Sequence, residues 1–375
     1  MKRLTRRQRL TRIFHGQVPD RPAVKVWGAG TRQDACIHPA FEPVRDRAVD
    51  RTDLMRHAGS PFSIYCGRRA GELLESRTEP TPSPEWQRQI TVYHTPGGDL
   101  RQVFLASTRK RPGYMVEHLL KEPADIGRLL SVPYEPYPFS AEEYRRVDTE
   151  VGDAGIPVFS LDHAMYALQR LVGSESFALW SLEAEEQLLA AMETFAGRLY
   201  DHARAALEAG IRGVFGWVGP ELCIPPLMSP AAFDRYVGDL DRPLIDLIHG
   251  AGGRIWVHCH GRMGPVLRRF VDMGVDVLNP IEPPPMGDIT LEAAFAVVGD
   301  AMALEGNIET HDFMVAGPDA MLCKVRAALE AGRGRRHILC PSSGYMENVE
   351  PSPQEIDNWL LYIDEGVRYA ESVCG

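Results

Sequence analysis

The chain alternates between short apolar runs and longer segments with helical periodicity. Eight short apolar runs occur, at residues 23–27, 62–66, 156–161, 211–217, 255–259, 275–279, 301–305 and 337–340. Most are followed by segments whose apolar residues recur every three or four positions, as expected of helices that pack on a sheet. Strands that alternate with helices form parallel βαβ units. Eight such units predict a closed (β/α)8 barrel, an α/β fold of the TIM-barrel type.

An open, doubly wound parallel sheet is the alternative architecture for this pattern. Sheets of that kind commonly bind nucleotides through a G-x-G-x-x-G or Walker sequence that follows a strand. Neither sequence is present, and Gly28-Ala29-Gly30 matches only the first half of the dinucleotide pattern. The barrel is therefore the preferred prediction, with residues 1–375 as a single domain.

Two segments stand outside the barrel repeat. Residues 1–22 combine several arginines with apolar residues at helical spacing, which predicts an amphipathic N-terminal helix with Thr5 as its cap. Between residues 86 and 106, two β-prone runs flank Pro96-Gly97-Gly98. This arrangement predicts a β-hairpin that is inserted beside the main sheet.

Composition and charge limit the classes of function. Hydrophobic residues make up 44% of the chain and charged residues 25%, as in ordinary globular proteins. The net charge of −10 disfavours binding to nucleic acid or to an anionic membrane. No window is apolar enough to span a bilayer, and the seven scattered cysteines argue against a disulfide framework. We therefore expect a cytoplasmic protein.

Residues with metal-binding side chains gather at the end of the run 255–259. On an extended strand His258 and His260 point to the same side, whereas Cys259 points to the other. Two imidazoles on one face need a third ligand from elsewhere, and Cys340 ends another predicted strand. His258, His260 and Cys340 are therefore predicted to bind zinc, which accepts nitrogen and sulfur ligands. The alternative is that these residues are ordinary core side chains.

In a barrel, active residues lie where the strands end. The acidic residues at such positions are Asp162, Glu221 and Glu282. Glu221 is predicted to be a fourth metal ligand or a general acid, and Asp162 and Glu282 are weaker catalytic candidates. For Asp162 and its neighbour His163, helix capping is the preferred interpretation.

Other reactive or aromatic residues are assigned structural roles. Trp217 and Tyr345 are expected to pack at the barrel mouth. The remaining cysteines are expected to be ordinary thiols: Cys36, Cys66, Cys223, Cys259, Cys323 and Cys374.

Three stretches carry a resemblance to a known family. They are the arginine-rich segment and His-Gly-Gln-Val-Pro-Asp-Arg-Pro at residues 6–22, Pro-Leu-Met-Ser-Pro at 226–230, and Ala-Leu-Glu-Gly-Asn-Ile at 303–308. With these three stretches in this order, the chain resembles the uroporphyrinogen decarboxylase superfamily. The resemblance implies a (β/α)8 barrel, in agreement with the strand count.

The superfamily has two branches, which differ in sequence features that can be compared with this chain. Its decarboxylases use no metal and hold a tetrapyrrole with arginines and an aspartate. Their N-terminal Arg-Gln-Ala-Gly-Arg signature is missing here, and only Arg32 in residues 26–32 could replace it. The other branch comprises zinc methyltransferases that work with corrinoid proteins and carry His-x-Cys, then a distant Cys. His260 stands where that branch has the first cysteine, and the second would fall nearer Ser343 than Cys340.

The resemblance therefore implies a zinc-dependent methyltransferase or demethylase. It would move a methyl group between a small methylated donor, or a thiol acceptor, and a corrinoid (cobalamin) carried by a partner protein. One alternative is a metal-free decarboxylase of a tetrapyrrole-like or carboxylated substrate. Others are a different zinc-dependent reaction, such as hydrolysis, and a non-catalytic partner of a corrinoid protein.

Overall fold

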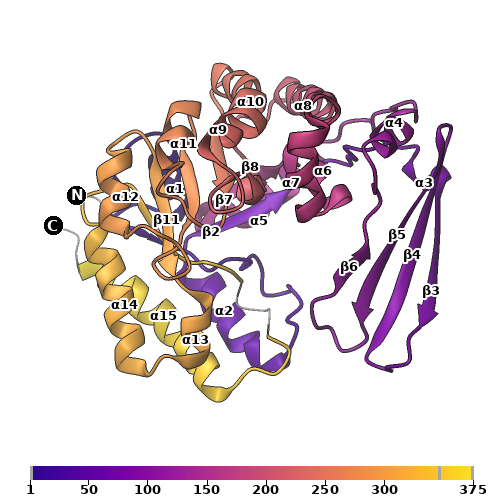
Figure 1. Ribbon diagram of the computed structural model, residues 1–375. Helices are drawn as coiled ribbons and strands as arrows, with labels where there is room; N and C mark the ends of the chain where they lie inside the picture. Colours follow the sequence, from indigo (N-terminus) through magenta and orange to yellow (C-terminus); the bar gives the residue numbers. More distant parts are fainter. Residues whose placement is uncertain (1–2, 345–347, 373–375) are drawn as a thin grey trace.

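Eight parallel strands form the central sheet of the protein, in a computed structural model that describes residues 3–344 and 348–372. The strands are β1 (Ala23–Val24), β2 (Leu54–Ala58), β7 (Gly155–Ser160), β8 (Val214–Val218), β9 (Arg254–His258), β10 (Val277–Ile281), β11 (Ala303–Ile308) and β12 (His337–Pro341). They lie in the order β1-β12-β11-β10-β9-β8-β7-β2. The sheet curls on itself and helices surround it (Figure 1). The predicted (β/α)8 barrel is confirmed.

Helices follow the strands, and most of them cover the outside of the barrel, while α3 and α4 lie beside the inserted sheet described below (Figure 1). They are α1 (Arg6–Phe14), α2 (Glu42–Arg51), α3 (Ala70–Leu73), α4 (Ala124–Leu130), α5 (Glu142–Val151), α6 (Ala164–Val172), α7 (Ser174–Glu183), α8 (Glu185–Glu208), α9 (Pro230–Phe233), α10 (Asp239–Gly250), α11 (Leu267–Met273), α12 (Leu291–Val298), α13 (Thr310–Val315), α14 (Pro318–Ala331) and α15 (Pro353–Ser372). Within the described ranges, none of these helices has the length and apolarity that a membrane crossing requires.

The second strand lies earlier in the chain than predicted. Residues 62–66 form no strand, and β2 is Leu54–Ala58 instead. This strand carries Arg56 and His57, which interrupt the apolar pattern that the prediction relied on. Both have polar partners, because Arg56 pairs with Glu150 of α5 at 2.8 Å and His57 Nδ1 lies 2.9 Å from the hydroxyl of Ser160 on β7. The prediction for this strand was wrong because its polar residues are satisfied by neighbouring elements.

One buried aspartate joins the two ends of the sheet order. The backbone N–H of Asp53 donates to the carbonyl of Val24 at 2.7 Å, and its Oδ2 accepts from the N–H of Val24 at 2.9 Å. Its Oδ1 accepts from Arg9 at 2.7 Å, and Arg21 lies 3.5 Å from Oδ2. Asp53 is fully buried. It therefore links β1 to β2 and fastens α1 to the same seam.

The N-terminal helix closes one end of the barrel. Thr5 caps α1 through a reciprocal pair of hydrogen bonds with Gln8, as the sequence predicts. On its apolar face Leu10, Ile13 and Phe14 are buried in one cluster with residues from the interior of the strands, Trp256 among them. Each such side chain contributes about 1.5–3 kcal/mol when it is removed from water. Because α1 covers this end, the opposite end is where ligands can enter.

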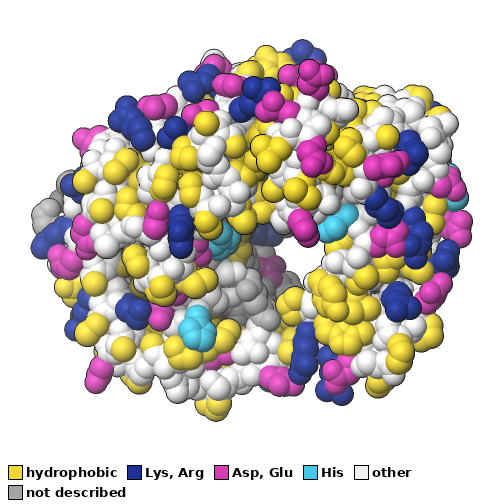
Figure 2. All heavy atoms as spheres, in the orientation of Figure 1, with side chains coloured by type: hydrophobic (Ala, Val, Ile, Leu, Met, Phe, Trp, Pro, Cys, Tyr) yellow, Lys and Arg dark blue, Asp and Glu magenta, His cyan; other side chains and the backbone are white. Residues whose placement is uncertain are grey.

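The inserted sheet is larger than the hairpin predicted for residues 86–106. It has four antiparallel strands in the order β3 (Leu74–Pro80), β4 (Trp86–Thr95), β5 (Gly98–Ser107) and β6 (Tyr114–Glu117). The predicted hairpin corresponds to β4 and β5. The outer strands are mostly exposed and lack a clear alternation of apolar residues, so their sequences gave little signal. The sheet stands to one side of the barrel (Figure 1), and an opening separates the two in the space-filling view (Figure 2).

Breaking the Asp53 seam should destabilise the protein strongly. In Asp53→Asn the guanidinium of Arg9 loses a buried carboxylate, and loss of one partner of a buried ion pair costs about 3–5 kcal/mol. The free energy of unfolding, measured by denaturant titration, should fall by that amount. Asp50→Asn is the matched control, because Asp50 pairs with Arg32 on the surface and such pairs contribute less than about 1 kcal/mol. Equal losses in the two variants would contradict the role given to Asp53.

Candidate active site

Two histidines lie together where β9 ends. His258 is the last residue of the strand, and His260 follows it after one residue. Their ring centroids are 4.5 Å apart and the ring planes are nearly perpendicular, at 84°. Gly261 turns the chain away at a φ of 111°, a conformation that favours glycine. The two imidazoles thus meet at the open end of the barrel, as the alternation along a strand predicts.

Side chains from β10 and the loop behind it hold both rings. The Nδ1 of His258 lies 2.6 Å from Oδ1 of Asn279, and the Nδ1 of His260 lies 2.9 Å from Oε1 of Glu282. The other oxygen of Glu282 accepts from the N–H of Gly261 at 2.7 Å. In both rings Nδ1 is therefore engaged, which leaves Nε2 for a ligand. Metal-binding histidines commonly have this arrangement, in which the second nitrogen donates to a carboxylate or a carbonyl.

The two rings have different electrostatic surroundings. Burial, together with the nearby His260, lowers the pKa of His258 to about 3, so this imidazole is neutral at physiological pH. Burial also acts to lower the pKa of His260, but the hydrogen bond and the charge of Glu282 outweigh it and raise that pKa above its ordinary value. Glu282 therefore orients His260 and makes it more basic. Both of its oxygens are already engaged.

Two further acids lie near His260. Glu221 lies in the turn Pro220–Cys223 after β8, and Glu309 follows β11 directly. Each has one buried carboxylate oxygen without a hydrogen-bond partner. Burial raises the pKa of Glu221, and burial together with the charge of Glu282 raises the pKa of Glu309 to about 7. Each also interacts electrostatically with His260.

Glu309 was not among the site residues predicted from the sequence. The predicted strand at residues 301–305 ended too early, whereas β11 extends to Ile308. The rule that active residues follow strand ends would have selected Glu309 if this boundary had been placed correctly.

Cys340, the third predicted ligand, has other partners in the structure. It is fully buried on β12, where Glu305 and the backbone of Trp27 lie close enough to its thiol to affect its pKa. Burial raises the pKa of this thiol well above its ordinary value. Across residues 3–344 and 348–372, no three His, Cys, Asp or Glu side chains are grouped closely enough to hold a metal ion. The structure thus brings His258 and His260 together and places the Cys340 thiol on Glu305.

Two further residues considered in the sequence, His163 and Asp162, contact α6 and α10. His163 caps α6 by accepting from the N–H of Tyr166, and its Nε2 lies 3.0 Å from Asp241. Asp162 pairs with Arg170 at 3.4 Å, and burial raises the pKa of its carboxyl.

Trp217 and Cys259, two of the residues expected to pack, are both buried. Trp217 is buried, and Cys259 lies in the apolar core behind the two histidines. Tyr345 and Cys374 lie outside the described residues.

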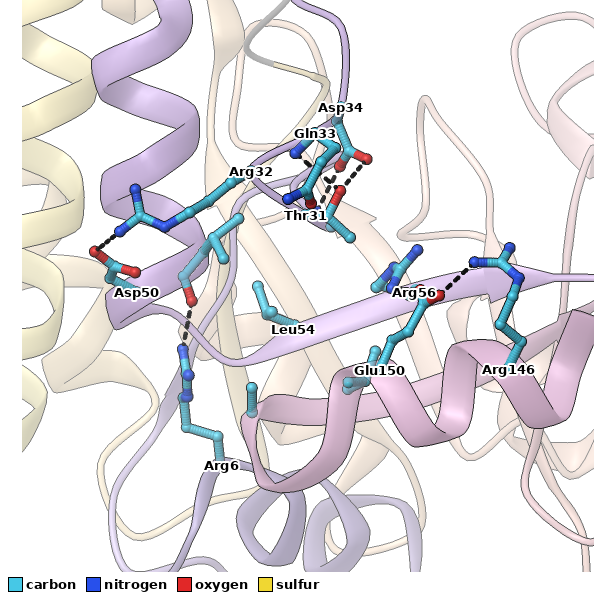
Figure 3. A pocket seen from close by; sticks show the side chains of 14 residues that line it. Arg6, Thr31, Arg32, Gln33, Asp34, Asp50, Leu54, Arg56, Arg146 and Glu150 are labelled. Carbon is cyan, nitrogen blue, oxygen red and sulfur yellow. Dashed lines mark hydrogen bonds and ion pairs between the residues drawn. The ribbon is translucent and has the colours of Figure 1, made fainter.

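A surface pocket of about 880 Å³ lies away from the histidines, beside β2 and α5 (Figure 3). Four arginines line it, Arg6, Arg32, Arg56 and Arg146. Arg6 donates to backbone carbonyls, and the other three pair with acidic side chains. Because these cations are already neutralised or engaged, the pocket offers no free charge to a ligand. The barrel mouth is the better candidate site.

The fold and the mouth residues together define the class of protein. It is a (β/α)8 barrel whose histidine and glutamate side chains gather at the carboxyl ends of the strands, where barrel enzymes carry their active sites. The family model for uroporphyrinogen decarboxylase (URO-D) matches residues 109–355, well over half of the chain. The chain therefore belongs to the uroporphyrinogen decarboxylase family of enzymes, as the sequence resemblance indicated.

Individual relatives represent both branches of this family. The chain is 26% identical over 186 residues to the methylcobamide:CoM methyltransferase MtaA of Methanosarcina barkeri, covering 48% of this chain and only 51% of that protein. It is 24% identical over 325 residues to the uroporphyrinogen decarboxylase of Parasynechococcus marenigrum, covering 79% and 87%. A methyltransferase from Methanosarcina mazei shares the fold, with a TM-score of 0.60 and 17% identity over 96% of this chain and 99% of that one.

Removing the charge of Glu282 should make His260 less basic. In Glu282→Gln the hydrogen bond and the negative charge that raise the pKa of His260 are both lost, while burial still acts to lower it. The pKa of His260, followed by NMR titration of metal-free protein, should fall by about one unit or more, which corresponds to about 1.4 kcal/mol per unit. Glu292→Gln, an equal charge change on the exposed surface of α12, should leave it unchanged. An unaltered pKa in Glu282→Gln would contradict the assignment.

Proposed function

We propose that the protein is a corrinoid-linked methyltransferase that uses a zinc ion held by His258 and His260. The observation that carries the proposal is the pair of imidazoles at the barrel mouth, each with Nδ1 engaged and Nε2 left for a ligand. The likeness to a methylcobamide-dependent methyltransferase over about half of its length supports the same branch of the family. The small methyl donor or thiol acceptor would bind at the mouth, and a partner protein would bring the corrinoid.

Among the described residues, the mouth offers two ligands to a divalent cation, and a third would have to move into reach. Two imidazoles lie side by side, and Glu221 and Glu309, each with an unpartnered buried oxygen, interact electrostatically with His260. The third ligand that the sequence predicts is Cys340, whose thiol lies beside Glu305 and would have to turn to the ion. Glu221 or Glu309 is the alternative third or fourth ligand. Zinc accepts nitrogen, sulfur and carboxylate oxygen, so each of these sets is chemically suitable.

The residues of this chain would supply positioning and proton transfer. When bound, zinc supplies a Lewis acid that favours the deprotonated form of a thiol or polarises a methoxy or methylamine group. Asn279 and Glu282 keep the two imidazoles turned towards the mouth. Glu309, whose pKa of about 7 suits proton exchange at neutral pH, could take or return the proton of the acceptor.

A metal-free decarboxylase is the second candidate, since the alignment with a uroporphyrinogen decarboxylase covers most of both chains. Two observations speak against it. Arg32, the one arginine that could replace the missing N-terminal signature, pairs with Asp46 at 3.2 Å and with Asp50 at 2.5 Å in the surface pocket. The mouth carries the acids Glu221 and Glu309 instead. These acids supply no positive charge to a polycarboxylate substrate, which disfavours its binding.

Zinc content should depend on the proposed ligands. Purified wild-type protein should contain zinc, measured by plasma mass spectrometry, and His258→Ala and His260→Ala should bind it more than about 100-fold less tightly. A direct ligand matters more than its hydrogen-bond partners, whose loss alone costs about 10–100-fold. Cys340→Ser should also lower affinity, whereas Cys66→Ser, another buried thiol, should not. Retention of zinc in Cys340→Ser together with its loss in Glu309→Gln would show that the carboxylate is the ligand.

Methyl transfer should require a corrinoid. With methylcobalamin and a small thiol, the wild-type protein should demethylate the corrinoid, followed by its visible absorption, and His260→Ala should slow this reaction by more than about 100-fold. Release of carbon dioxide from uroporphyrinogen by chelator-treated protein would overturn the proposal in favour of the decarboxylase. Hydrolysis of a methyl ester without any corrinoid would overturn it in favour of a hydrolytic enzyme.

A further inference from the structure

A buried carboxylate lies beneath the two histidines and collects several hydrogen-bond donors. Glu305 on β11 has no exposed surface. Its Oε1 accepts from the ammonium of Lys25 at 2.7 Å and from Nδ2 of Asn279 at 2.9 Å, and its Oε2 accepts from the indole N–H of Trp256 at 2.9 Å. An ammonium and an indole N–H can only donate. Glu305 is therefore held as an ionised acceptor inside the barrel.

This carboxylate decides which way the amide of Asn279 points. A carboxylate accepts hydrogen bonds and offers none, so it must face the NH2 end of the amide. The oxygen end of Asn279 then faces Nδ1 of His258, at 2.6 Å. The reverse orientation would place the amide oxygen against the carboxylate oxygens, which repel it. Asn279 thus has a single orientation that satisfies both neighbours.

The orientation of the amide in turn selects the tautomer of His258. An amide oxygen carries no hydrogen, so the hydrogen in this 2.6 Å contact must come from Nδ1 of His258. A neutral imidazole has one N–H, and with that hydrogen on Nδ1 the lone pair remains on Nε2. We propose that Glu305, charge-balanced by Lys25, fixes the Nδ1–H tautomer of His258 through Asn279. Glu305 and Asn279 are then positioning residues that act through His258.

The aromatic rings around Lys25 support its role as the cation that balances the charge of Glu305. Its ammonium lies 4.7 Å from the ring centroid of Trp27 and 5.0 Å from that of Trp256, within the range of cation–π attraction. The ring of Trp27 also lies against His258, with centroids 4.7 Å apart. A buried ion pair adds little stability compared with well-packed apolar residues. A role in orienting His258 accounts for the polar chain, whereas stability alone does not.

The tautomer is open to direct measurement without substrate or metal. In protein labelled with 15N-histidine, long-range proton–nitrogen correlation spectra distinguish a protonated Nδ1 from a protonated Nε2, and His258→Gln identifies the signals. Metal-free wild-type protein should show His258 as the Nδ1–H tautomer. Asn279→Leu, which removes the acceptor, should shift His258 to the Nε2–H tautomer or to a mixture. Asn279→Asp keeps an acceptor oxygen towards Nδ1, and a proton shared between its other oxygen and Glu305 would replace the lost N–H, so this variant should retain the wild-type tautomer.

Glu305→Gln tests the next link of the chain. Its amide offers Asn279 a donor or an oxygen without the charge, so the orientation of Asn279 is no longer fixed and His258 should become a tautomer mixture. If this variant does not fold, the Asn279→Leu and Asn279→Asp pair still decides. Wild-type His258 as the Nε2–H tautomer, or an unchanged tautomer in Asn279→Leu, would overturn the proposal.

A titration with Co²⁺ distinguishes this inference from the proposed function. The tautomer of His258 does not depend on that function, and only the use of its Nε2 lone pair to bind a metal rests on it. Asn279→Leu should weaken Co²⁺ binding by about 10–100-fold, as loss of a hydrogen-bond partner of a ligating histidine does, and Asn279→Asp should restore it. If wild-type protein binds no Co²⁺ but shows the expected tautomers, the metal-dependent function fails and the tautomer assignment stands. Strong Co²⁺ binding that is equal in all three proteins would contradict the positioning role.

Discussion

The architecture depends on closing a parallel sheet between β1 and β2, which stand at the two ends of its strand order. Asp53 does this with one residue, since its backbone and its side chain both bond Val24 while its carboxylate holds Arg9. Next to this seam β1 pairs with β12, and Lys25, which follows β1, meets Glu305 of β11. The polar chain from Lys25 to His258 therefore begins directly beside the strand that Asp53 fastens.

Much of the fold could be predicted from the sequence because most barrel strands are buried on both faces and appear as uninterrupted apolar runs. The exception was β2, where Arg56 and His57 are satisfied by Glu150 and Ser160, partners that no local pattern reveals. The outer strands of the inserted sheet were missed for a related reason. They are largely exposed, so no burial constraint forced their side chains to alternate.

The candidate site could be predicted in part. The two-residue period of a strand was enough to pair His258 with His260, because both lie at the end of one strand. The role of Glu305 could not be found in this way, since a single acid within an apolar run does not show that donors from Lys25, Asn279 and Trp256 converge on it. Cys340 was selected as a ligand from its place at a strand end. Its actual contact with Glu305 depends on the inward direction of both side chains.

The closed end of the barrel also brings the first and last helices together. Arg3, just before α1, forms an ion pair with Glu371 near the end of α15. This contact lies on the side covered by α1, opposite to the mouth where the imidazoles lie. A label or surface linkage attached beside this contact would thus leave the mouth accessible, so the protein can be immobilised while the mouth stays open to large carriers.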